Sequence, residues 1–254
     1  MKVYIYDDTF KGYLTAIFKW FENKDFEDDV CRASLYGGNL INRPIDVFTD
    51  EACAARVVKG VLEKLGYEWL DMIHAVFLSE LPEADMLGAR AMRLGFKYGK
   101  SILNDERHEV IQPFLKVARA VKRETHSFLG FVRFSKLDSG IYYASCHPTY
   151  NILVLLAPHF ADRMGDQSWV IHDTGRGIAA FYNQSDWHIN TLNLSEPLLY
   201  AEDEMALRNN WRGYFEAVTI SERVNLKLQQ QKIPKKYWKY FTEDIGVLNQ
   251  NTIE

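Results

Sequence analysis

Two histidines and an aspartate are the residues of this sequence whose types best suit acid–base chemistry. His172 and Asp173 end a predicted strand, and His159 lies one helical turn before Arg163 in a helix expected over about 150–163. If these segments converge in one cleft, the imidazoles and the carboxylate could serve a hydrolase or a glycosylase-like enzyme as general base and acid. The alternative is that the same side chains cap the ends of a strand and a helix.

A lone arginine stands among aromatic residues in the run Gly130-Phe131-Val132-Arg133-Phe134, which we predict to lie in a strand over about 128–136. The run fits the second half of the RNA-recognition-motif signature, in which alternate aromatics of a strand stack on bases. The signature needs a basic residue and a glycine ahead of that half, where this chain has Ser127 and Phe128, so we do not expect a true motif. An arginine on such a strand needs an acidic partner or a phosphate or base in a groove. The sequence leaves both open.

A helix expected over about 105–125 gathers further cations. Its apolar residues lie on one side of a helical wheel and its basic residues on the other. Such a basic face is either a solvated surface or a stripe that binds phosphates. With three arginines further along the chain, these residues are our candidate nucleic-acid contacts: Arg133, Arg163, Arg176, Arg119, Lys122 and Arg123.

The run KLQQQKIPKKYWKYF (227–241) interleaves lysines with aromatic residues. This mixture suits a single-stranded nucleic acid, because lysines neutralise phosphates and aromatic rings stack on bases. Trp238 is the candidate stacking residue. A terminal helix that docks its aromatic side chains on the core explains the run equally well.

Motifs for bound nucleotides, metals and redox cofactors are missing from the sequence. The stretch 95–101 has three residues between its glycines, whereas a nucleotide-binding loop has four. The cysteines, Cys31, Cys53 and Cys146, form no CxxC pair, and the histidines are too dispersed for a zinc motif. We therefore expect no cofactor and no metal.

The composition is that of an ordinary globular protein, with 254 residues, 47% hydrophobic and 25% charged. A formal net charge of -4 gives no global attraction for polyanions, so nucleic-acid binding would need local basic patches. The apolar run before Asp7 is too short for a signal peptide or an anchor, and no later run approaches the ~18 residues of a membrane span. Three unpaired cysteines favour a reducing compartment, so we expect a cytoplasmic protein with no membrane association.

Apolar periodicity and capping residues predict the order of the elements. Helices are expected over about 10–23, 51–66, 67–79, 82–98, 105–125, 150–163, 203–220 and 234–241. Strands are expected over about 2–6, 128–136, 140–146, 169–172, 178–182 and 187–192. The acid-rich residues 22–29 are expected to form a solvated loop.

This order predicts an α+β fold with a helical N-terminal half, an antiparallel β-rich middle with a packed helix, and a helical C-terminal tail. Neither a repeat nor a clear linker divides the chain. We therefore expect a single domain over 1–254, helix-rich over 10–125, β-rich over 126–200 and with a helical tail over 201–254.

Five segments, in this order along the chain, resemble a family known as DNA metabolism proteins of unknown function. They are YDDTFKGYLTAIF (6–18), HSFLGFVRF (126–134), PTYNILVLLAPHFADRM (148–164), WVIHD (169–173) and PKKYWKYF (234–241). Members of that family are associated with a radical-SAM protein and with uracil-DNA-glycosylase-like domains, so the resemblance implies a setting in DNA modification or repair. It supplies no catalytic residues, and we expect any glycosylase domain to belong to a separate protein.

Three hypotheses follow from these observations. The first is a nucleic-acid-binding accessory protein, with DNA as the expected ligand. The second is a hydrolase or glycosylase-like enzyme that uses His172, Asp173 and His159. The third is a scaffold that docks onto a radical-SAM partner.

Overall fold

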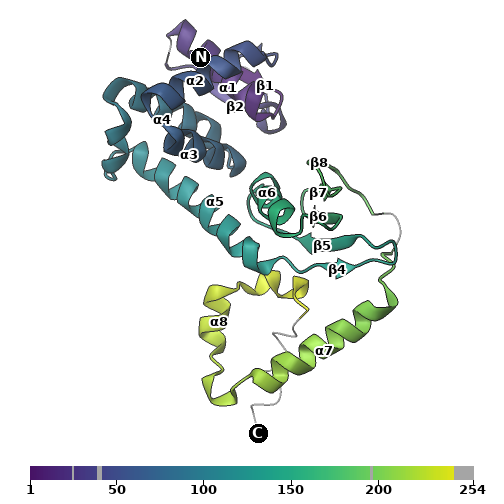
Figure 1. Ribbon diagram of the computed structural model, residues 1–254. Helices are drawn as coiled ribbons and strands as arrows, with labels where there is room; N and C mark the ends of the chain where they lie inside the picture. Colours follow the sequence, from purple (N-terminus) through teal and green to yellow (C-terminus); the bar gives the residue numbers. More distant parts are fainter. Residues whose placement is uncertain (25, 39–41, 195–196, 243–254) are drawn as a thin grey trace. The chain divides into compact units, whose positions relative to one another are not determined.

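The structure, a computed structural model, describes residues 1–24, 26–38, 42–194 and 197–242 (Figure 1). Helices and strands both contribute to it, which confirms the predicted α+β class. The chain divides into two compact units, unit 1 (residues 1–123) and unit 2 (residue 124 onward). The expectation of a single domain stays a prediction.

Unit 1 begins with a small parallel sheet in the order β2-β1-β3. The predicted first strand is β1 (Lys2–Tyr6), and it pairs with β2 (Asp29–Arg32) and β3 (Arg43–Asp46). A short 3-10 turn, η1 (Ala33–Leu35), follows β2. The sequence patterns predict neither neighbour of β1, because a four-residue strand with charged ends or a proline gives little local signal.

The helix α1 (Phe10–Asn23) connects β1 to β2, within the predicted bounds. Thr9 is its N-cap, and the Thr9 Oγ1 accepts a hydrogen bond of 2.9 Å from the Gly12 backbone N–H. The side of the helix that faces the core buries Leu14, Ile17 and Trp20.

Three more helices and a 3-10 segment build the rest of unit 1 together with the first part of α5. They are α2 (Glu51–Lys64), α3 (Tyr67–Leu78), α4 (Ala84–Tyr98), η2 (Lys100–Asn104) and α5 (Ile111–Phe131). The first three agree with the predicted helices, and Asp50 caps α2 as its position ahead of the helix indicates. The largest fully buried side chains here include Trp20, Trp69 and Phe114.

A buried ion pair joins β2 to α4 in this core. The Arg32 Nη2 lies 2.6 Å from the Asp85 Oδ1, and the two side chains are only 6% and 2% exposed. The Arg32 Nη2 also donates to the Phe77 carbonyl, and the Arg32 backbone N–H and Nε donate to Asp85 Oδ2. These additional hydrogen bonds satisfy the two charges, which a buried pair requires.

Unit 2 is built on a five-stranded mixed sheet in the order β4-β5-β6-β7-β8. Its strands are β4 (Ser135–Lys136), β5 (Tyr142–Cys146), β6 (Trp169–Asp173), β7 (Ile178–Tyr182) and β8 (Trp187–Thr191). The last four match predicted strands. The prediction of an antiparallel sheet is wrong for one pair, because β5 and β6 run parallel and are joined through α6 (Leu153–Arg163).

The helix α6 packs against this sheet and contributes apolar side chains to the core of unit 2 (Figure 1). Leu153, Leu156, Ala157 and Phe160 are buried, and the Phe160 ring lies 6.4 Å, between ring centroids, from Trp169 on β6. This is the packed helix that the sequence predicts for the middle of the chain.

The helix α5 corrects the prediction of a strand over 128–136. It continues to Phe131, and within the predicted range only the two residues of β4 form a strand. Phe128 and Phe131 are thus neighbours one helical turn apart, with ring centroids separated by 5.7 Å. A short aromatic run does not distinguish a strand period from a helical one, which is why the sequence pattern misleads here.

The C-terminal part of unit 2 consists of α7 (Glu202–Val218), η3 (Ser221–Arg223), α8 (Leu226–Lys232) and η4 (Lys235–Tyr240). Two of these were expected as helices, and the second of them, η4, has 3-10 rather than α geometry. Among the residues that the structure describes, no helix combines the length and the apolar character needed to cross a membrane.

Candidate nucleic-acid interface

The predicted basic face of α5 is largely neutralised by acidic partners within unit 1. The Arg119 Nη2 lies 2.5 Å from the Glu106 Oε1, and Lys122 forms an ion pair with Asp71. Arg123 is exposed at the end of the unit. A cation that already has a carboxylate partner must give it up to bind a phosphate, so this face is a weaker phosphate site than its sequence indicates.

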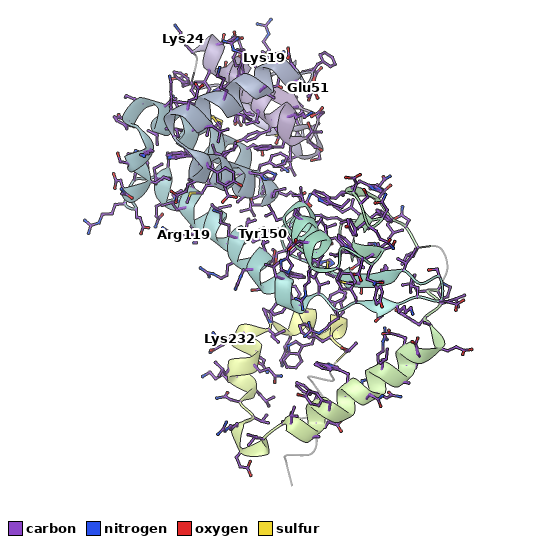
Figure 2. The ribbon with its side chains drawn as sticks, viewed as in Figure 1. Lys19, Lys24, Glu51, Arg119, Tyr150 and Lys232 are labelled. Atoms are coloured by element: carbon purple, nitrogen blue, oxygen red, sulfur yellow. The ribbon has the colours of Figure 1, made fainter. Side chains whose placement is uncertain are left out.

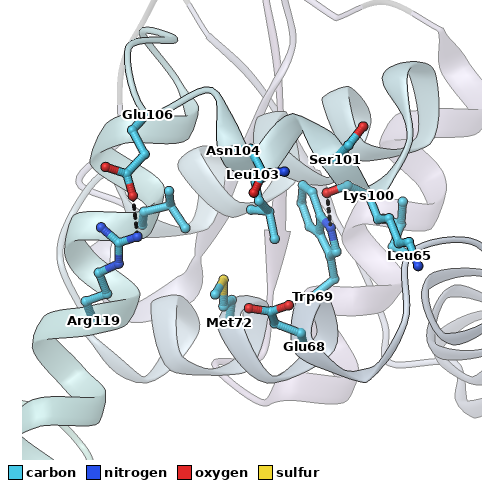
Figure 3. A pocket seen from close by; sticks show the side chains of 11 residues that line it. Leu65, Glu68, Trp69, Met72, Lys100, Ser101, Leu103, Asn104, Glu106 and Arg119 are labelled. Carbon is cyan, nitrogen blue, oxygen red and sulfur yellow. Dashed lines mark hydrogen bonds and ion pairs between the residues drawn. The ribbon is translucent and has the colours of Figure 1, made fainter.

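A cavity of about 490 Å³ lies beside the Arg119–Glu106 pair (Figure 3). Its apolar wall consists of Leu65, Trp69, Met72, Leu103 and Leu115, and its polar lining consists of Glu68, Lys100, Ser101, Asn104, Glu106 and Arg119. The Trp69 Nε1 donates to the Lys100 carbonyl at 3.3 Å. The polar lining carries both positive and negative side chains, so the cavity does not concentrate positive charge as a phosphate-binding surface does.

In unit 2, Asp173 ends β6 at the edge where the parallel strands β5 and β6 both finish. Its side chain is fully buried and lies 2.9 Å from the Arg176 Nη1. The same carboxylate accepts hydrogen bonds from the backbone N–H groups of Gly175 and Arg176, and the Arg176 guanidinium donates to two carbonyls of the loop after β5, those of Pro148 and Thr149. This pair therefore joins two loops.

His172 is buried on β6, and its Nδ1 lies 2.7 Å from the Tyr143 hydroxyl on β5. Burial lowers the pKa of His172 and raises the pKa of Tyr143 to about 12, so both groups are neutral near pH 7. Consecutive residues of a strand face opposite sides of a sheet, so the His172 and Asp173 side chains point apart.

The third predicted acid–base residue lies elsewhere on unit 2. His159 is exposed on α6, where its ring packs against Phe160 at a centroid distance of 5.1 Å. Arg163 is exposed in the last turn of the same helix. Among the described residues, no hydrogen bond or ion pair joins His159 to His172 or Asp173, and no group of three or more His, Cys, Asp or Glu side chains is placed to hold a metal ion.

The strongest concentration of cations lies on α8 and η4, and we call its members the lysine segment: Lys227, Lys232, Lys235, Lys236 and Lys239. All five side chains are exposed, and none forms an ion pair with a described residue. Residues 223–242 contain neither aspartate nor glutamate. Lys232 is labelled at the end of α8 in Figure 2. Positive charge therefore collects here although the chain is acidic as a whole.

A buried tyrosine anchors the lysine segment to the core of unit 2. Tyr237 is 5% exposed, its ring packs against Phe128 and Phe131 of α5, and its hydroxyl donates to Glu124 at 2.6 Å. On either side, the Lys236 Nζ donates to the Thr149 Oγ1 at 2.6 Å, and the Tyr240 and Thr174 hydroxyls lie 3.2 Å apart. The anchor holds η4 beside the loops that follow β5 and β6.

Arg133 and Trp238 lie close to this anchor. The Arg133 Nη1 donates to the Gly130 carbonyl at 2.6 Å, and the guanidinium lies over the Phe241 ring with Cζ 4.7 Å from the ring centroid. The half-buried Trp238 donates from Nε1 to the Ile233 carbonyl at 2.8 Å, and Lys235 lies over its ring. Arg133 thus binds a carbonyl that the end of α5 leaves without a helical donor.

The sequence patterns identify the lysine segment but not what holds it. The alternation of lysines and aromatics is visible in the run 227–241, and the structure confirms that part of its aromatic set docks on the core. Glu124 and Thr149 gave no signal, because their roles depend on contacts with residues about ninety to over one hundred positions away.

A family model described as a domain of unknown function (DUF4130) matches residues 82–243, which include α4, α5, the five-stranded sheet and the lysine segment. No curated protein matches the chain.

Proposed function

Because the chain belongs to the DUF4130 family of domains of unknown function, we propose a function from its own geometry: it binds nucleic acid, with DNA as the expected ligand, through the lysine segment. Arg133 and Trp238 flank the proposed surface, and Arg176 lies in the loop to which η4 is held.

One observation carries this proposal. Five exposed lysines lie within thirteen positions of the chain and have no acidic partner among the described residues. Lysines elsewhere form ion pairs, as Lys11 does with Glu51 and Lys59 with Glu63. Ammonium groups without acidic partners repel each other where they approach, and a polyanion relieves that repulsion while it releases condensed counterions.

The aromatic residues of the segment favour a single strand over a duplex. Trp238 and Tyr240 are half-buried, so each keeps part of its ring at the surface, whereas Tyr237 is committed to the core. Exposed rings between lysines are the combination that stacks on unpaired bases and neutralises their phosphates.

The wider setting follows from the family resemblance of the sequence. We propose an accessory role in DNA modification or repair in the cytoplasm, together with a radical-SAM protein. The alternative of a scaffold that docks onto this radical-SAM partner also stays a prediction, as do the phosphate contacts expected of Arg119, Lys122, Arg123 and Arg163.

The hydrolase or glycosylase-like alternative has less support from the geometry. Asp173 is occupied by Arg176 and two backbone N–H groups, and His172 faces the opposite side of the sheet. The nucleic-acid proposal is therefore the one that we test first.

The test compares two double variants of equal charge. Lys235→Gln with Lys239→Gln removes two members of the lysine segment, and Lys11→Gln with Lys59→Gln removes two paired lysines of unit 1. Binding of a labelled oligothymidine, of the corresponding duplex and of a single-stranded RNA is measured by fluorescence anisotropy between about 50 and about 200 mM salt. The wild type should bind the oligothymidine most tightly.

The salt dependence decides the outcome. Each lost phosphate contact should reduce the log–log slope for a single strand by about 0.7, so the first double variant should lose about 1.4 and the control should keep the wild-type slope. No binding by the wild type near 50 mM salt would refute the proposal. Equal losses in both double variants would show that net charge, and not this surface, attracts the strand.

A further inference from the structure

One row of residues defines the inward side of α7. Its members are buried or half-buried and follow each other at intervals of four, four, three and four positions: Glu204, Arg208, Arg212, Phe215 and Thr219. Every other residue of the helix is exposed. Residues three and four positions apart lie one above the other on a helix, so this inward row follows a single side of α7.

The polar part of the inward row is paired within unit 2. The Glu204 carboxylate accepts hydrogen bonds from the Lys136 backbone N–H at 3.0 Å and from the Arg208 Nε at 2.9 Å. The Arg212 Nε donates to the Thr242 carbonyl at 3.1 Å. Thr242 is the last residue that the structure describes, so the chain that follows it starts from the middle of the inward row.

The other end of the inward row borders an apolar groove. A cavity of about 410 Å³ lies between the end of α7 and α8, and its apolar lining consists of Phe215, Ile220, Val224 and Leu228. Ile220 and Leu228 are each 49% exposed, so the described residues leave them largely uncovered. The described lining also contains two cations, Arg223 and Lys232, and no acidic residue. The groove therefore suits an apolar segment that carries negative charge.

The sequence that follows Thr242 has this composition. Residues 243–254 lie outside the described part of the chain and read EDIGVLNQNTIE, with three acidic residues and no basic one. Two acidic residues come first, and Ile245, Val247 and Leu248 follow them. Six extended residues span up to about 20 Å, whereas seven positions of a helix, the separation of Arg212 from Thr219, span only about 10 Å. Residues 243–248 can therefore reach the groove from the position of Thr242.

We propose that residues 243–248 fill this groove in the same molecule. The side chains of Ile245 and Leu248 then cover its apolar lining, and the two carboxylates that precede them face its cations. Lys232 is one of these cations and also belongs to the lysine segment. The docked carboxylates therefore lower the positive charge that a strand meets, and in this respect the inference rests on the proposed function: residues 243–248 regulate the binding of nucleic acid.

Disulfide formation tests the docking without any nucleic acid. Leu228→Cys is combined with Leu248→Cys in the 254-residue chain, with the half-buried Cys31 and Cys53 replaced by serine. Ala217→Cys with Leu248→Cys is the matched control, because Ala217 is exposed near the same end of α7 but on the side away from the inward row. Circular dichroism checks that the variants fold.

A docked segment should crosslink to Leu228→Cys under mild oxidation and leave the Ala217→Cys control reduced, because a disulfide needs its two Cα atoms within about 7 Å. An undocked segment would bring its cysteine to both positions at a similar effective concentration. Ile245→Cys replaces Leu248→Cys in a second set of pairs, so that the result does not depend on one register.

The salt dependence of strand binding tests the regulation. Ile245→Ser with Leu248→Ser removes the apolar contacts and leaves the charge unchanged. This double variant should release the segment and steepen the log–log salt slope for oligothymidine by about 0.7 for each lysine that becomes available. Gln250→Ser with Asn251→Ser is the control and should keep the wild-type slope.

The two measurements separate the outcomes. Equal crosslinking of the Leu228→Cys and Ala217→Cys pairs would overturn the docking, whatever the strand measurements show. A crosslinked product of twice 29.5 kDa would assign the groove to the same segment of a second copy, which contradicts docking within one molecule. Selective crosslinking with an unchanged salt slope in the released variant would refute the regulation alone. Absence of oligothymidine binding in both the wild type and the released variant would refute the proposed function and the regulation with it, and the crosslink would still decide the docking.

Discussion

The hydroxyl of Tyr237 donates a hydrogen bond of 2.6 Å to the carboxylate of Glu124, a residue 113 positions earlier in the chain. The same carboxylate accepts from the backbone N–H groups of Thr149 and Tyr150, at 2.9 and 2.8 Å. Burial and the bond to Glu124 raise the pKa of Tyr237, so the hydroxyl keeps its proton. One carboxylate thus connects α5, the loop after β5 and η4.

Removing only that hydroxyl should loosen the lysine segment. Tyr237→Phe keeps the ring among its aromatic neighbours and loses the hydrogen bond to a charged acceptor, so we expect the free energy of unfolding to fall by about 1.5–3 kcal/mol. Urea unfolding measures the loss, and hydrogen exchange should rise first in 233–241. Tyr214→Phe, at a 58% exposed site, is the control and should change neither. Unaltered exchange in 233–241 would mean that the rings alone hold η4.

Arg133→Ala decides between the two roles left open for this arginine. The guanidinium binds the Gly130 carbonyl and lies over Phe241, so its removal should cost about 1–3 kcal/mol of stability and leave the salt slope of DNA binding unchanged. Arg133→Lys should recover only part of the stability, because an ammonium lacks the planar fork. A shallower salt slope with an unchanged melting temperature would instead show a phosphate contact.

Two glycines inside helices should respond oppositely to alanine. A Cβ at Gly88 of α4 would lie 2.4 Å from the Tyr13 hydroxyl oxygen, which is buried and donates to the Asp85 carbonyl at 2.7 Å. Gly88→Ala should therefore lower the melting temperature, although alanine favours a helix by about 1 kcal/mol.

Gly60→Ala in α2 is the matched comparison for Gly88→Ala. The nearest side-chain atom to its new Cβ would be the Phe96 Cζ at 3.7 Å, which is ordinary van der Waals contact. This variant should raise the melting temperature, by up to the helix-propensity gain of about 1 kcal/mol. Stabilisation by both alanines would contradict the close packing of Tyr13 against α4.

The buried histidine on β6 should make stability depend on pH. Burial lowers the pKa of His172 below its ordinary value of 6.5, so the unfolded chain takes up a proton at a pH where the folded chain does not. The free energy of unfolding should then fall as the pH drops below about 6.5 and become constant below the folded pKa.

His172→Gln should flatten this part of the profile, measured by urea unfolding at a series of pH values. Burial also lowers the pKa of His74 in unit 1, so this residue should make its own contribution to the pH dependence of stability. The double variant His74→Gln/His172→Gln should therefore have a flatter profile than His172→Gln alone. If the His172→Gln protein kept the full wild-type pH dependence, His172 would take up a proton as readily in the folded protein as in the unfolded chain.

Features fixed by neighbouring residues could be predicted from the sequence, and those fixed by distant ones could not. The start of α1 follows from Thr9 and the start of α2 from Asp50, because a capping side chain acts within one turn. The length of α2 follows from its apolar period. The parallel pairing of β5 with β6 follows from the helix α6 between them, and the predicted strand–helix–strand order already contains this signal, which the expectation of an antiparallel sheet overlooks.

The candidate site shows the same division. The lysines of the segment and their aromatic neighbours are adjacent in sequence, so their pattern indicates a basic surface. The neutralisation of Lys122 depends on Asp71, 51 positions away on another helix, and a helical wheel of α5 contains no information about it. The sequence pattern predicts a strand around Arg133 because the same aromatic run fits both periods, whereas the structure continues α5 to Phe131.

The bond between Tyr237 and Glu124 also has a consequence for the order in which the chain folds. A contact across 113 positions carries a large loop-closure entropy, so it forms late, after the local helices and hairpins. Until then the Phe128 and Phe131 rings lack the aromatic neighbour that covers them. A unit 2 in which η4 has not yet docked should therefore expose an apolar surface on α5, and this surface is where misassembly between nascent chains would begin.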